Sequence, residues 1–593
     1  VLGRVLVKFL KLAGLVALLL AVCACGAYLG RHELTRINEE LPSFTAAAGE
    51  TQEERIAMQD GVKLFATVML PKGEGPFPAV LVRNPYARFS TVMRDTLCGR
   101  FVRYGYACVL QDVRGQGESE GEWSPMVNEV RDGRDTINWL VGQSFQDGNI
   151  AMVGPSYLAS VQYAVAASGL PEEVKTLVPA VYTTDLSNVL YSNGMFRHET
   201  FTAWASMMRG TNSDVDDAGG DYQKAIRYLP HNKVDTDVFG LPMPWYQDMI
   251  DIERAQKSFF NNHDSLLIAE VPERIEVPIL MVSGWYDVFF GGQMADWKKL
   301  ATRSNSRFVL GPWTHSGGSG EAFEIDNADG GLFQWKEMLS WLEHHLKGKP
   351  LENPAGLYAF TMGENDWHYY EEWPGPIAKQ TFNLNKLLDS PGCDGGELAL
   401  EQGLSEPVSY QYDPLDPVPT KGGAGMLAFI LPGFEGASPA NVLQDGLCER
   451  QDVLTFVTSP FESSMLIAGQ ISVNLEISSS APDTAFTAKL IEVFPNGSAV
   501  NIRDNITSLA YRDGGFNLRE YTPGESITLK IDMWPIEWRV SEGSRIRLDI
   551  SSSDFPKFHA HRNRAGPWAE QDGVDVATQT LFSGTLELPV STR

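Results

Sequence analysis

The N-terminal half of the chain alternates between short, continuous apolar runs and stretches with helical spacing. Apolar runs occur at residues 79–82, 106–110, 150–153 and 176–178, and a helix-like segment at 132–142 lies between the second and the third. Strands that are buried on both faces read as continuous apolar runs, and helices between them indicate parallel connections. This half therefore predicts a parallel sheet that is covered by helices on both faces.

The pattern is interrupted and then returns. Residues 186–266 are rich in aromatic and methionine side chains but contain few strand-like runs, which predicts an inserted, mostly helical cap. Apolar runs at 277–282 and 307–310 then continue the sheet, and a helix at about 332–346 is expected to close the domain.

The C-terminal part has a different periodicity. Residues 471–477, 526–532 and 545–550 alternate between apolar and polar positions, with turn residues between them. A period of two is typical of antiparallel strands with one solvated face, which predicts a β-sandwich. The predicted units are an N-terminal segment (1–31), an α/β domain in two parts (52–185 and 267–349), the cap (186–266) and an all-β domain (350–593).

The N-terminal segment is apolar and uncharged over residues 12–30, and three basic residues precede it. A cleaved signal usually has an apolar stretch of about 7–15 residues, whereas a spanning helix needs about 17–25. We therefore expect residues 1–31 to direct export, as a retained anchor in the membrane, as a cleaved signal, or as a signal that ends at a lipid-modified Cys23 or Cys25. Each alternative predicts an extracytoplasmic protein, either membrane-anchored or released.

Charge and cysteine content exclude several classes of partner. The formal net charge is −27, which argues against a nucleic acid as the ligand because such a partner requires a basic face. Cys98, Cys108, Cys393 and Cys448 lie outside the N-terminal segment and allow three disulfide pairings, all of which the sequence leaves open. Since there is no Cys/His cluster with zinc spacing, we expect neither a metal nor a cofactor.

Three residues form the candidate catalytic set. Ser156 follows the apolar run that ends at Val153 and precedes a helix-like segment, which is the context of a nucleophile on a sharp strand-to-helix turn. Asp287 and His315 each follow a later apolar strand, and the order Ser, Asp, His is that of α/β-hydrolases. His315 would take the serine proton and Asp287 would orient the imidazole.

The turn departs from the generic G-x-S-x-G signature, because Leu158 stands at the position of the second glycine. We expect the small Ala159 to relieve the turn. The backbone N–H of Tyr157 is the first candidate donor of an oxyanion hole. The Tyr86 hydroxyl is the candidate second donor, and the alternative is that Tyr86 is a packed aromatic side chain of its loop.

Several motifs together resemble the cocaine esterase / X-Pro dipeptidyl-peptidase family of serine hydrolases. They are R-N-P-Y (83–86), D-V-R-G-x-G-x-S-x-G (112–121), G-x-S-Y (154–157), G-W-Y-D (284–287), G-P-W-T-H-S (311–316), A-P-D-T-x-F-T-x-K-L (481–490) and I-S-S-S-D-F-P (550–556). The resemblance covers about residues 52–590. It implies an α/β-hydrolase fold with an inserted helical cap, followed by a jelly roll.

By the family pattern, Ser156, Asp287 and His315 are the catalytic triad, and Tyr86 forms the oxyanion hole with the Tyr157 amide. The expected reaction is hydrolysis of an ester or amide of a small acyl substrate through a serine acyl-enzyme. The alternatives are an X-Pro dipeptidyl peptidase, an α-amino acid ester hydrolase and, from another class, a non-catalytic glycan-binding protein.

The residues after Asp287 bear on substrate choice. Relatives that prefer α-amino acid esters place further acidic residues beside the triad aspartate, whereas here no carboxylate follows until Asp296. Phe289 and Phe290 lie between them, which favours an uncharged acyl group. The alternative is that both phenylalanines pack under the next helix and that the cap determines selectivity.

Overall fold

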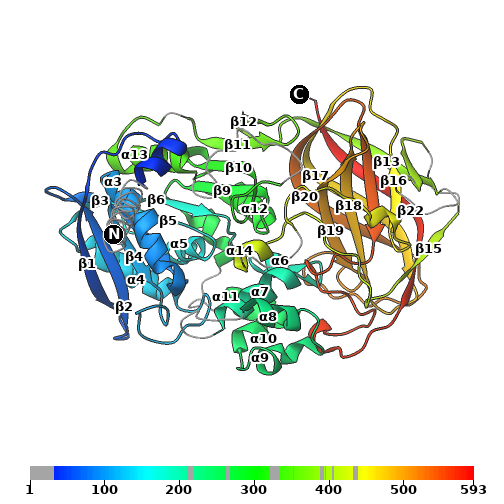
Figure 1. The fold of residues 1–593 in the computed structure, drawn as a ribbon, viewed down its shortest axis with the longest axis horizontal. Helices are drawn as coiled ribbons and strands as arrows, with labels where there is room; N and C mark the ends of the chain where they lie inside the picture. Colours follow the sequence, from blue (N-terminus) through cyan, green and yellow to red (C-terminus); the bar gives the residue numbers. More distant parts are fainter. Residues whose placement is uncertain are drawn as a thin grey trace, which may run out of the picture.

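The computed structural model describes residues 32–209, 218–261, 268–320, 334–351, 353–387, 393, 395–401, 403, 406–431 and 438–592. The predicted signal or anchor segment at 1–31 lies outside the described residues. Within the described ranges, no helix combines the length and the apolar character that crossing a bilayer requires. An α/β domain and an all-β domain lie side by side, and the cap helices lie between them at one edge (Figure 1).

The first sheet has ten strands in the order β1-β2-β4-β3-β5-β6-β9-β10-β11-β12. Neighbouring strands are parallel from β4 to β11, and the pairs at the two ends of the order are antiparallel. The strands are β1 (Ala48–Ala57), β2 (Lys63–Pro71), β3 (Phe77–Asn84), β4 (Ala107–Asp112), β5 (Gln146–Pro155), β6 (Val174–Ala180), β9 (Leu280–Tyr286), β10 (Arg307–Thr314), β11 (Gly356–Thr361) and β12 (Asp366–Tyr370). The parallel sheet that the apolar runs predict is confirmed.

Helices cover both faces of this sheet. On β3, Ala79 and Leu81 pack into the core beneath α4 and α5, whereas Val80 and Val82 pack into the core beneath α3 and α13. This two-sided burial explains why the strand reads as one continuous apolar run. The helices of this domain are α2 (Ser90–Met93), α3 (Gly99–Arg103), α4 (Glu129–Val141), α5 (Tyr157–Ala167), α12 (Phe290–Lys299) and α13 (Trp335–Lys347).

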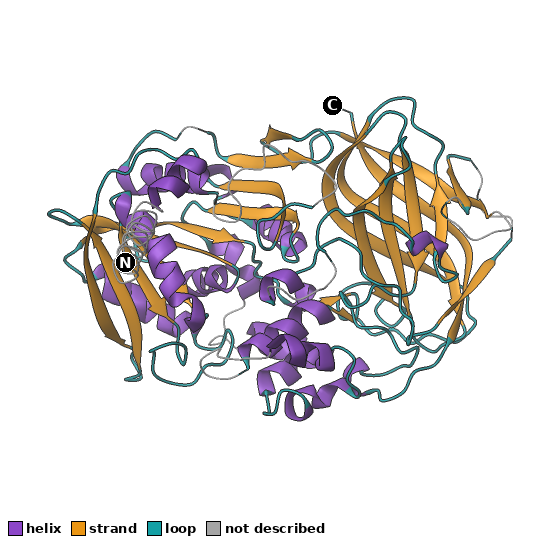
Figure 2. Cartoon of the chain, viewed as in Figure 1, coloured by secondary structure: helices purple, strands orange, loops and turns teal. Residues whose placement is uncertain are grey.

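The segment between β6 and β9 is mostly helical, as the pattern predicts (Figure 2). Its elements are α6 (Ser187–Leu190), β7 (Tyr191–Ser192), β8 (Met195–Phe196), α7 (His198–Met208), α8 (Ala218–Ala225), α9 (Val234–Asp237), α10 (Pro244–Ile250) and α11 (Ile252–Asn261). Trp204 and Trp245 of this cap pack against Trp123 of the α/β domain, with ring centroids 6.0 and 5.8 Å from that of Trp123 and 5.3 Å from each other. This apolar cluster fixes the cap to the loop that follows β4.

The C-terminal domain is all-β. Its sheet runs in the order β19-β18-β21-β16-β14-β13-β22-β17-β20, with β15 paired to β22, and the end strands β19 and β20 pack together so that the sheet closes on itself. The strands are β13 (Ile377–Leu387), β14 (Gly396–Ala399), β15 (Val408–Tyr412), β16 (Leu454–Val457), β17 (Met465–Ser479), β18 (Ala485–Val493), β19 (Ala499–Ser508), β20 (Ile527–Val540), β21 (Arg545–Ser551) and β22 (Ala577–Ser591). The three alternating segments of the sequence lie in β17, β20 and β21.

The first sheet continues past residue 349, where the pattern places the end of the α/β domain. Both β11 and β12 belong to this sheet, although they lie within the range 350–593. The edge strand β12 is antiparallel and only partly buried, so its sequence resembles the strands of the second domain. Buried Glu537 of β20 holds this edge against the all-β domain, because its carboxylate accepts hydrogen bonds from the Tyr370 hydroxyl and the Trp373 indole, each at 2.6 Å.

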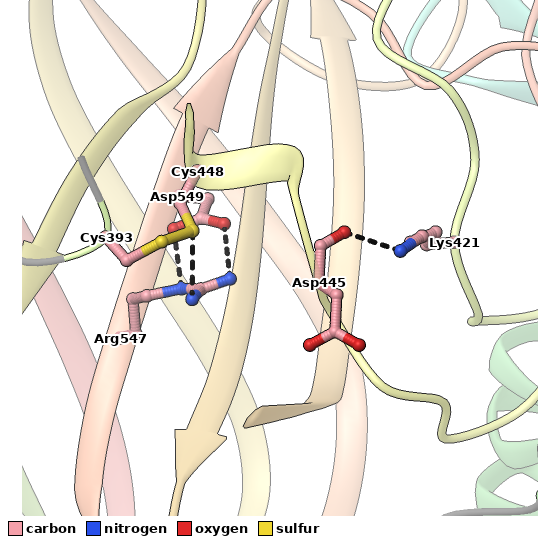
Figure 3. Close-up of a disulfide and its surroundings, with 6 residues drawn as sticks. All are labelled: Cys393, Lys421, Asp445, Cys448, Arg547 and Asp549. Atoms are coloured by element: carbon pink, nitrogen blue, oxygen red, sulfur yellow. Dashed lines mark hydrogen bonds and ion pairs between the residues drawn. A yellow bond between two sulfur atoms is a disulfide. The ribbon is translucent and has the colours of Figure 1, made fainter. Parts of the chain in front are cut away.

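Two disulfides select one of the three pairings that the sequence allows. Cys98 pairs with Cys108, and Cys393 pairs with Cys448. The second disulfide lies beside the buried Arg547–Asp549 ion pair, and a guanidinium nitrogen of Arg547 lies 3.5 Å from the Cys448 sulfur (Figure 3). Nearby, the Lys421 ammonium donates to the Asp445 carbonyl oxygen at 2.5 Å.

Buried histidines join the cap to the all-β domain. The rings of His198 and His231 from the cap lie 4.5 Å apart, and the Trp568 ring stacks on His231 at 5.0 Å and on His559 at 4.4 Å. Burial lowers the pKa of His198 to about 3 and holds the pKa values of His231 and His559 well below the ordinary value. The histidines of this interface are therefore neutral at physiological pH.

This stack predicts acid sensitivity. In the unfolded chain these histidines bind protons below about pH 6.5, whereas in the folded protein His198 stays neutral down to about pH 3. The unfolded state therefore binds more protons as the pH falls from 6.5 towards 3, and each such histidine lowers the unfolding free energy by up to about 1.4 kcal/mol per pH unit. Urea unfolding between pH 7.5 and 5.5 measures this slope. His559→Gln should flatten it, and the control His368→Gln on β12 should not. Equal slopes in both variants would contradict the prediction.

Candidate functional site

Ser156 occupies the turn between β5 and α5. Its backbone has φ 59° and ψ −127°, a conformation that non-glycine residues rarely adopt. Its amide donates to the carbonyl oxygen of Ala180 on the neighbouring strand β6 at 2.9 Å. The turn therefore lies at the carboxyl edge of the parallel sheet, where open α/β sheets carry their sites.

The space at Gly154 explains how the turn accommodates Leu158, the residue that departs from the G-x-S-x-G signature. A Cβ atom at Gly154 would lie 2.4 Å from the Leu158 Cβ, so only a glycine at the first position leaves space for a leucine at the second. We expected the small Ala159 to relieve the turn, whereas the close contact lies between Gly154 and Leu158.

Asp287 and His315 meet at the same edge. They follow the neighbouring parallel strands β9 and β10, which approach so closely that a Cβ atom at Gly284 would lie 2.0 Å from the Trp313 carbonyl oxygen. His315 Nδ1 lies 2.6 Å from Asp287 Oδ2, and both side chains are buried. The other oxygen, Oδ1, accepts the Phe289 amide N–H at 2.8 Å. Because Asp287 accepts on the Nδ1 side, the neutral imidazole carries its proton on Nδ1 and presents Nε2 as a proton acceptor.

Tyr86 lies beside the serine. The Tyr86 hydroxyl interacts with the Ser156 and Trp204 side chains, and burial raises the pKa of the phenol despite these contacts. Asn84 fixes the backbone of this loop, because its carboxamide accepts from the Tyr86 amide and donates to the Tyr86 carbonyl oxygen, each at 3.0 Å. The phenol thus stays protonated at neutral pH and can donate a hydrogen bond.

Tyr157 begins α5, so its amide belongs to the first turn of the helix, next to Ser156. The structure thus brings Asp287 into contact with His315, and Tyr86 into contact with Ser156. Phe289 lies close to both pairs. It lines the cavity at Ser156, and its ring lies 5.3 Å from the His315 ring. The catalytic roles of these residues stay a prediction.

An apolar cavity of about 110 Å³ opens at Ser156. For comparison, a cavity of about 150 Å³ admits benzene. The one charged side chain among its described lining residues is Arg88, and none of these residues is acidic. The lining comprises Tyr86, Arg88, Phe89, Met93, Met126, Pro155, Ser156, Tyr157, Leu158, Tyr182, Leu186, Thr200, Phe201, Trp204, Met207, Met249, Phe289, Met426 and Ile430.

The all-β domain contributes Met426 and Ile430 to this wall, and no motif or periodicity predicts a pocket role for either residue. They lie at α14 (Leu427–Ile430), in the connection between β15 and β16. Buried Glu199 of the cap accepts the backbone N–H groups of Met426 and Leu427 at 3.2 and 2.9 Å, which holds this short helix against α7. Cap aromatics that the sequence allowed as pocket residues, such as Phe201, also line the cavity.

The all-β domain also supports the strand that carries Asp287. The buried Arg503 guanidinium of β19 donates to the carbonyl oxygens of Trp285 and Pro535. The Trp285 indole donates to the Phe360 carbonyl oxygen of β11 at 2.7 Å. Among the described residues, no group of three His, Cys, Asp or Glu side chains is arranged to hold a metal ion.

The chain is similar to known proteins over most of its length. Residues 60–317 match the family model of X-Pro dipeptidyl-peptidase (S15 family), and residues 352–574 match that of the X-Pro dipeptidyl-peptidase C-terminal non-catalytic domain. The chain is 30% identical over 552 residues to the cocaine esterase of Rhodococcus sp. (strain MB1 Bresler), which covers 88% of this chain and 94% of that protein.

Two solved structures share the whole fold. An aminopeptidase from a marine sediment archaeon, Thaumarchaeota archaeon, has a TM-score of 0.77 at 22% identity, and the match covers 93% of this chain and 98% of that one. An α-amino acid ester hydrolase has a TM-score of 0.77 at 23% identity, with the same coverage. The matched domains and the extent of the identity to cocaine esterase show that this chain belongs to the cocaine esterase / X-Pro dipeptidyl-peptidase family of serine hydrolases.

Proposed function

We propose that the protein hydrolyses esters of small, uncharged acyl groups through an acyl-enzyme on Ser156. The observation that carries the proposal is the buried 2.6 Å contact between His315 Nδ1 and Asp287 Oδ2, at the sheet edge that also bears the Ser156 turn. A histidine held in this tautomer is the base that a serine nucleophile requires.

The residues have distinct roles in the proposed reaction. Ser156 Oγ attacks the acyl carbonyl while His315 Nε2 takes its proton, and Asp287 stabilises the resulting imidazolium. The Tyr157 amide and the Tyr86 hydroxyl donate to the oxyanion. His315 then protonates the leaving alcohol, and water attacks the acyl-enzyme by the same steps, which releases the acid.

The apolar cavity supports an uncharged acyl group. Asp296 is the first carboxylate after Asp287. Its oxygens accept hydrogen bonds from the Thr183 hydroxyl and from the Thr184 amide and hydroxyl at 2.6–2.8 Å, so this carboxylate is already engaged in contacts within the protein. Phe289 lines the cavity. Phe290 instead packs with its ring centroid 5.2 Å from that of Trp285, as the alternative reading of the sequence expects for both phenylalanines.

The peptidase alternative is less favoured. Release of X-Pro units, or hydrolysis of α-amino acid esters, requires a partner for the substrate's α-ammonium group, because an unpaired buried cation is costly. The described lining residues include no acidic side chain, and the Arg88 cation would repel an ammonium group.

We also propose that the protein acts outside the cytoplasm. The apolar segment at 12–30 and the disulfides Cys98–Cys108 and Cys393–Cys448 support export, since disulfides persist in oxidising compartments. N-terminal sequencing of the mature protein distinguishes an anchor, a cleaved signal and a lipidated cysteine.

Substitutions in the triad should show that its members act as one unit. Ser156→Ala and His315→Ala should each lower kcat by several orders of magnitude, and the double variant should lose little more. Asp287→Asn should also be severe, because the imidazole would lose its tautomer control. Initial rates with a p-nitrophenyl ester measure these effects. Multiplicative losses in the double variant would refute the assignment.

Tyr86→Phe should lower kcat by about 100- to 1000-fold, because it removes one donor to the developing oxyanion, and should leave the unfolding midpoint nearly unchanged. Steady-state kinetics and thermal unfolding of the purified variant test this. A kcat within about threefold of the wild type would place the second donor elsewhere.

Neutral acyl esters should be better substrates than their α-amino counterparts. We expect phenylacetate esters to exceed phenylglycine esters by a factor of at least about 10 in kcat/KM, because the described lining residues offer the ammonium group no acidic partner. Competition between esters with the same leaving group measures the ratio. A preference for phenylglycine esters, or for Gly-Pro anilides over both, would overturn the acyl assignment.

A further inference from the structure

Two separate elements carry the donors of the proposed oxyanion hole. The Tyr157 amide lies at the start of α5, and Tyr86 lies in the loop after β3. Donors stabilise an oxyanion best when they are fixed before the reaction. The contacts that set the distance between these two elements should therefore affect kcat of the proposed reaction.

Glu129, the first residue of α4, lies between the two elements. Its Oε1 accepts the Tyr157 hydroxyl at 3.1 Å, and its Oε2 lies 3.0 Å from a guanidinium nitrogen of Arg83. Arg83 belongs to β3, three residues before Tyr86. Glu129, Arg83 and Tyr157 are 3%, 1% and 2% exposed, so water does not screen these contacts.

The Tyr157 side chain is anchored twice. Its hydroxyl donates to Glu129 and accepts the Met126 backbone N–H at 2.7 Å. The side chain and the amide belong to one residue, and that residue is joined directly to the strained Ser156. Holding the ring at its far end thus restricts how the first turn of α5 can rotate.

The segment from Arg83 to Tyr86 is fixed by side-chain hydrogen bonds as well. The Arg83 guanidinium donates to the Gln111 side chain at 2.8 Å and to the Glu129 carbonyl oxygen at 3.2 Å. The next residue, Asn84, braces the Tyr86 backbone on both sides. Displacement of the guanidinium would therefore be transmitted to the loop that carries the hydroxyl donor.

A second buried ion pair on α4, between Asp132 and Arg114, serves as a structural comparison for the Glu129 contacts. Asp132 binds Arg114 through two hydrogen bonds of 2.8 and 2.6 Å, which join the helix to the loop after β4. The contacts described for this pair do not reach Ser156 or its neighbours. Glu129 differs because one of its oxygens contacts Tyr157 and the other contacts Arg83, and these two residues lead to the two donors of the oxyanion hole.

We propose that Glu129 is a positioning residue that sets the geometry of the oxyanion hole, through Tyr157 on one side and Arg83 on the other. This inference rests on the proposed function, since it concerns the same reaction. It predicts that Glu129 acts on the transition state and not on substrate binding.

Tyr157→Phe is the sharpest test, because it keeps the amide donor and removes only the anchoring hydroxyl. It should lower kcat about tenfold, the equivalent of one net hydrogen bond, and leave KM within about twofold. The matched control is Tyr163→Phe, which removes another buried hydroxyl from α5 outside the site and should leave kcat unchanged. Thermal unfolding of both variants separates a loss of geometry from a loss of stability.

Glu129→Gln tests the carboxylate itself. The carboxamide can still accept the Tyr157 hydroxyl but loses the charge that holds Arg83, so we again expect a loss of about tenfold in kcat with little change in KM. The double variant with Tyr157→Phe should lose less than the product of the two single effects, because both substitutions disturb the same network of contacts centred on Glu129. Affinity for a boronic acid, which forms a tetrahedral adduct with an active serine, should fall by the same factor as kcat.

The outcomes separate this inference from the proposed function. A wild-type protein without esterase activity, or without affinity for the boronic acid, would overturn both. An active wild type with Tyr157→Phe equal to Tyr163→Phe, or with unchanged boronic acid affinity in Glu129→Gln, would overturn the positioning role alone. A rise in KM with constant kcat would do the same, since it would show an effect on ground-state binding.

Discussion

A serine with φ 59° and ψ −127° is the constraint around which this protein is arranged. Such a backbone costs on the order of 1–3 kcal/mol and persists only where the surroundings over-determine it. Here β6 binds the Ser156 amide, Gly154 leaves the space that Leu158 fills, and Glu129 anchors the side chain of Tyr157. The position of the Ser156 hydroxyl at the sheet edge is thus a product of packing on several elements.

The α/β domain, its cap and the all-β domain surround that turn. Asp287 and His315 directly follow the adjacent strands β9 and β10, and they meet because the carboxyl ends of parallel strands share one edge. The cap and the all-β domain close the apolar cavity and are joined by Glu199 and by the histidine stack. The jelly roll is therefore part of the wall of the cavity at Ser156. Its residue Arg503 also supports the strand that leads to Asp287.

The local pattern of the sequence predicted the parallel sheet, the helical cap and the alternating C-terminal strands, since strand burial leaves a local signal. The strand-to-helix turn at Ser156 leaves one too, whereas the catalytic roles of the candidate triad stay a prediction. The Cys393–Cys448 pairing, the entry of Met426 into the cavity and the link from Glu129 to Tyr157 were not predictable. Each joins residues that are distant in sequence, and their spacing carries no periodic signal. The boundary at residue 349 is misplaced for another reason, because the partly buried edge strand β12 resembles the strands of the second domain.

Labelling with a fluorophosphonate tests the central claim most directly, because such a probe reacts with an activated serine and not with an ordinary hydroxyl. The chain contains many serines, and the account predicts that peptide mass spectrometry will find one adduct, on the peptide that contains Ser156. The label should be absent after His315→Ala. No adduct in the folded protein, or an adduct on another serine, would contradict the account.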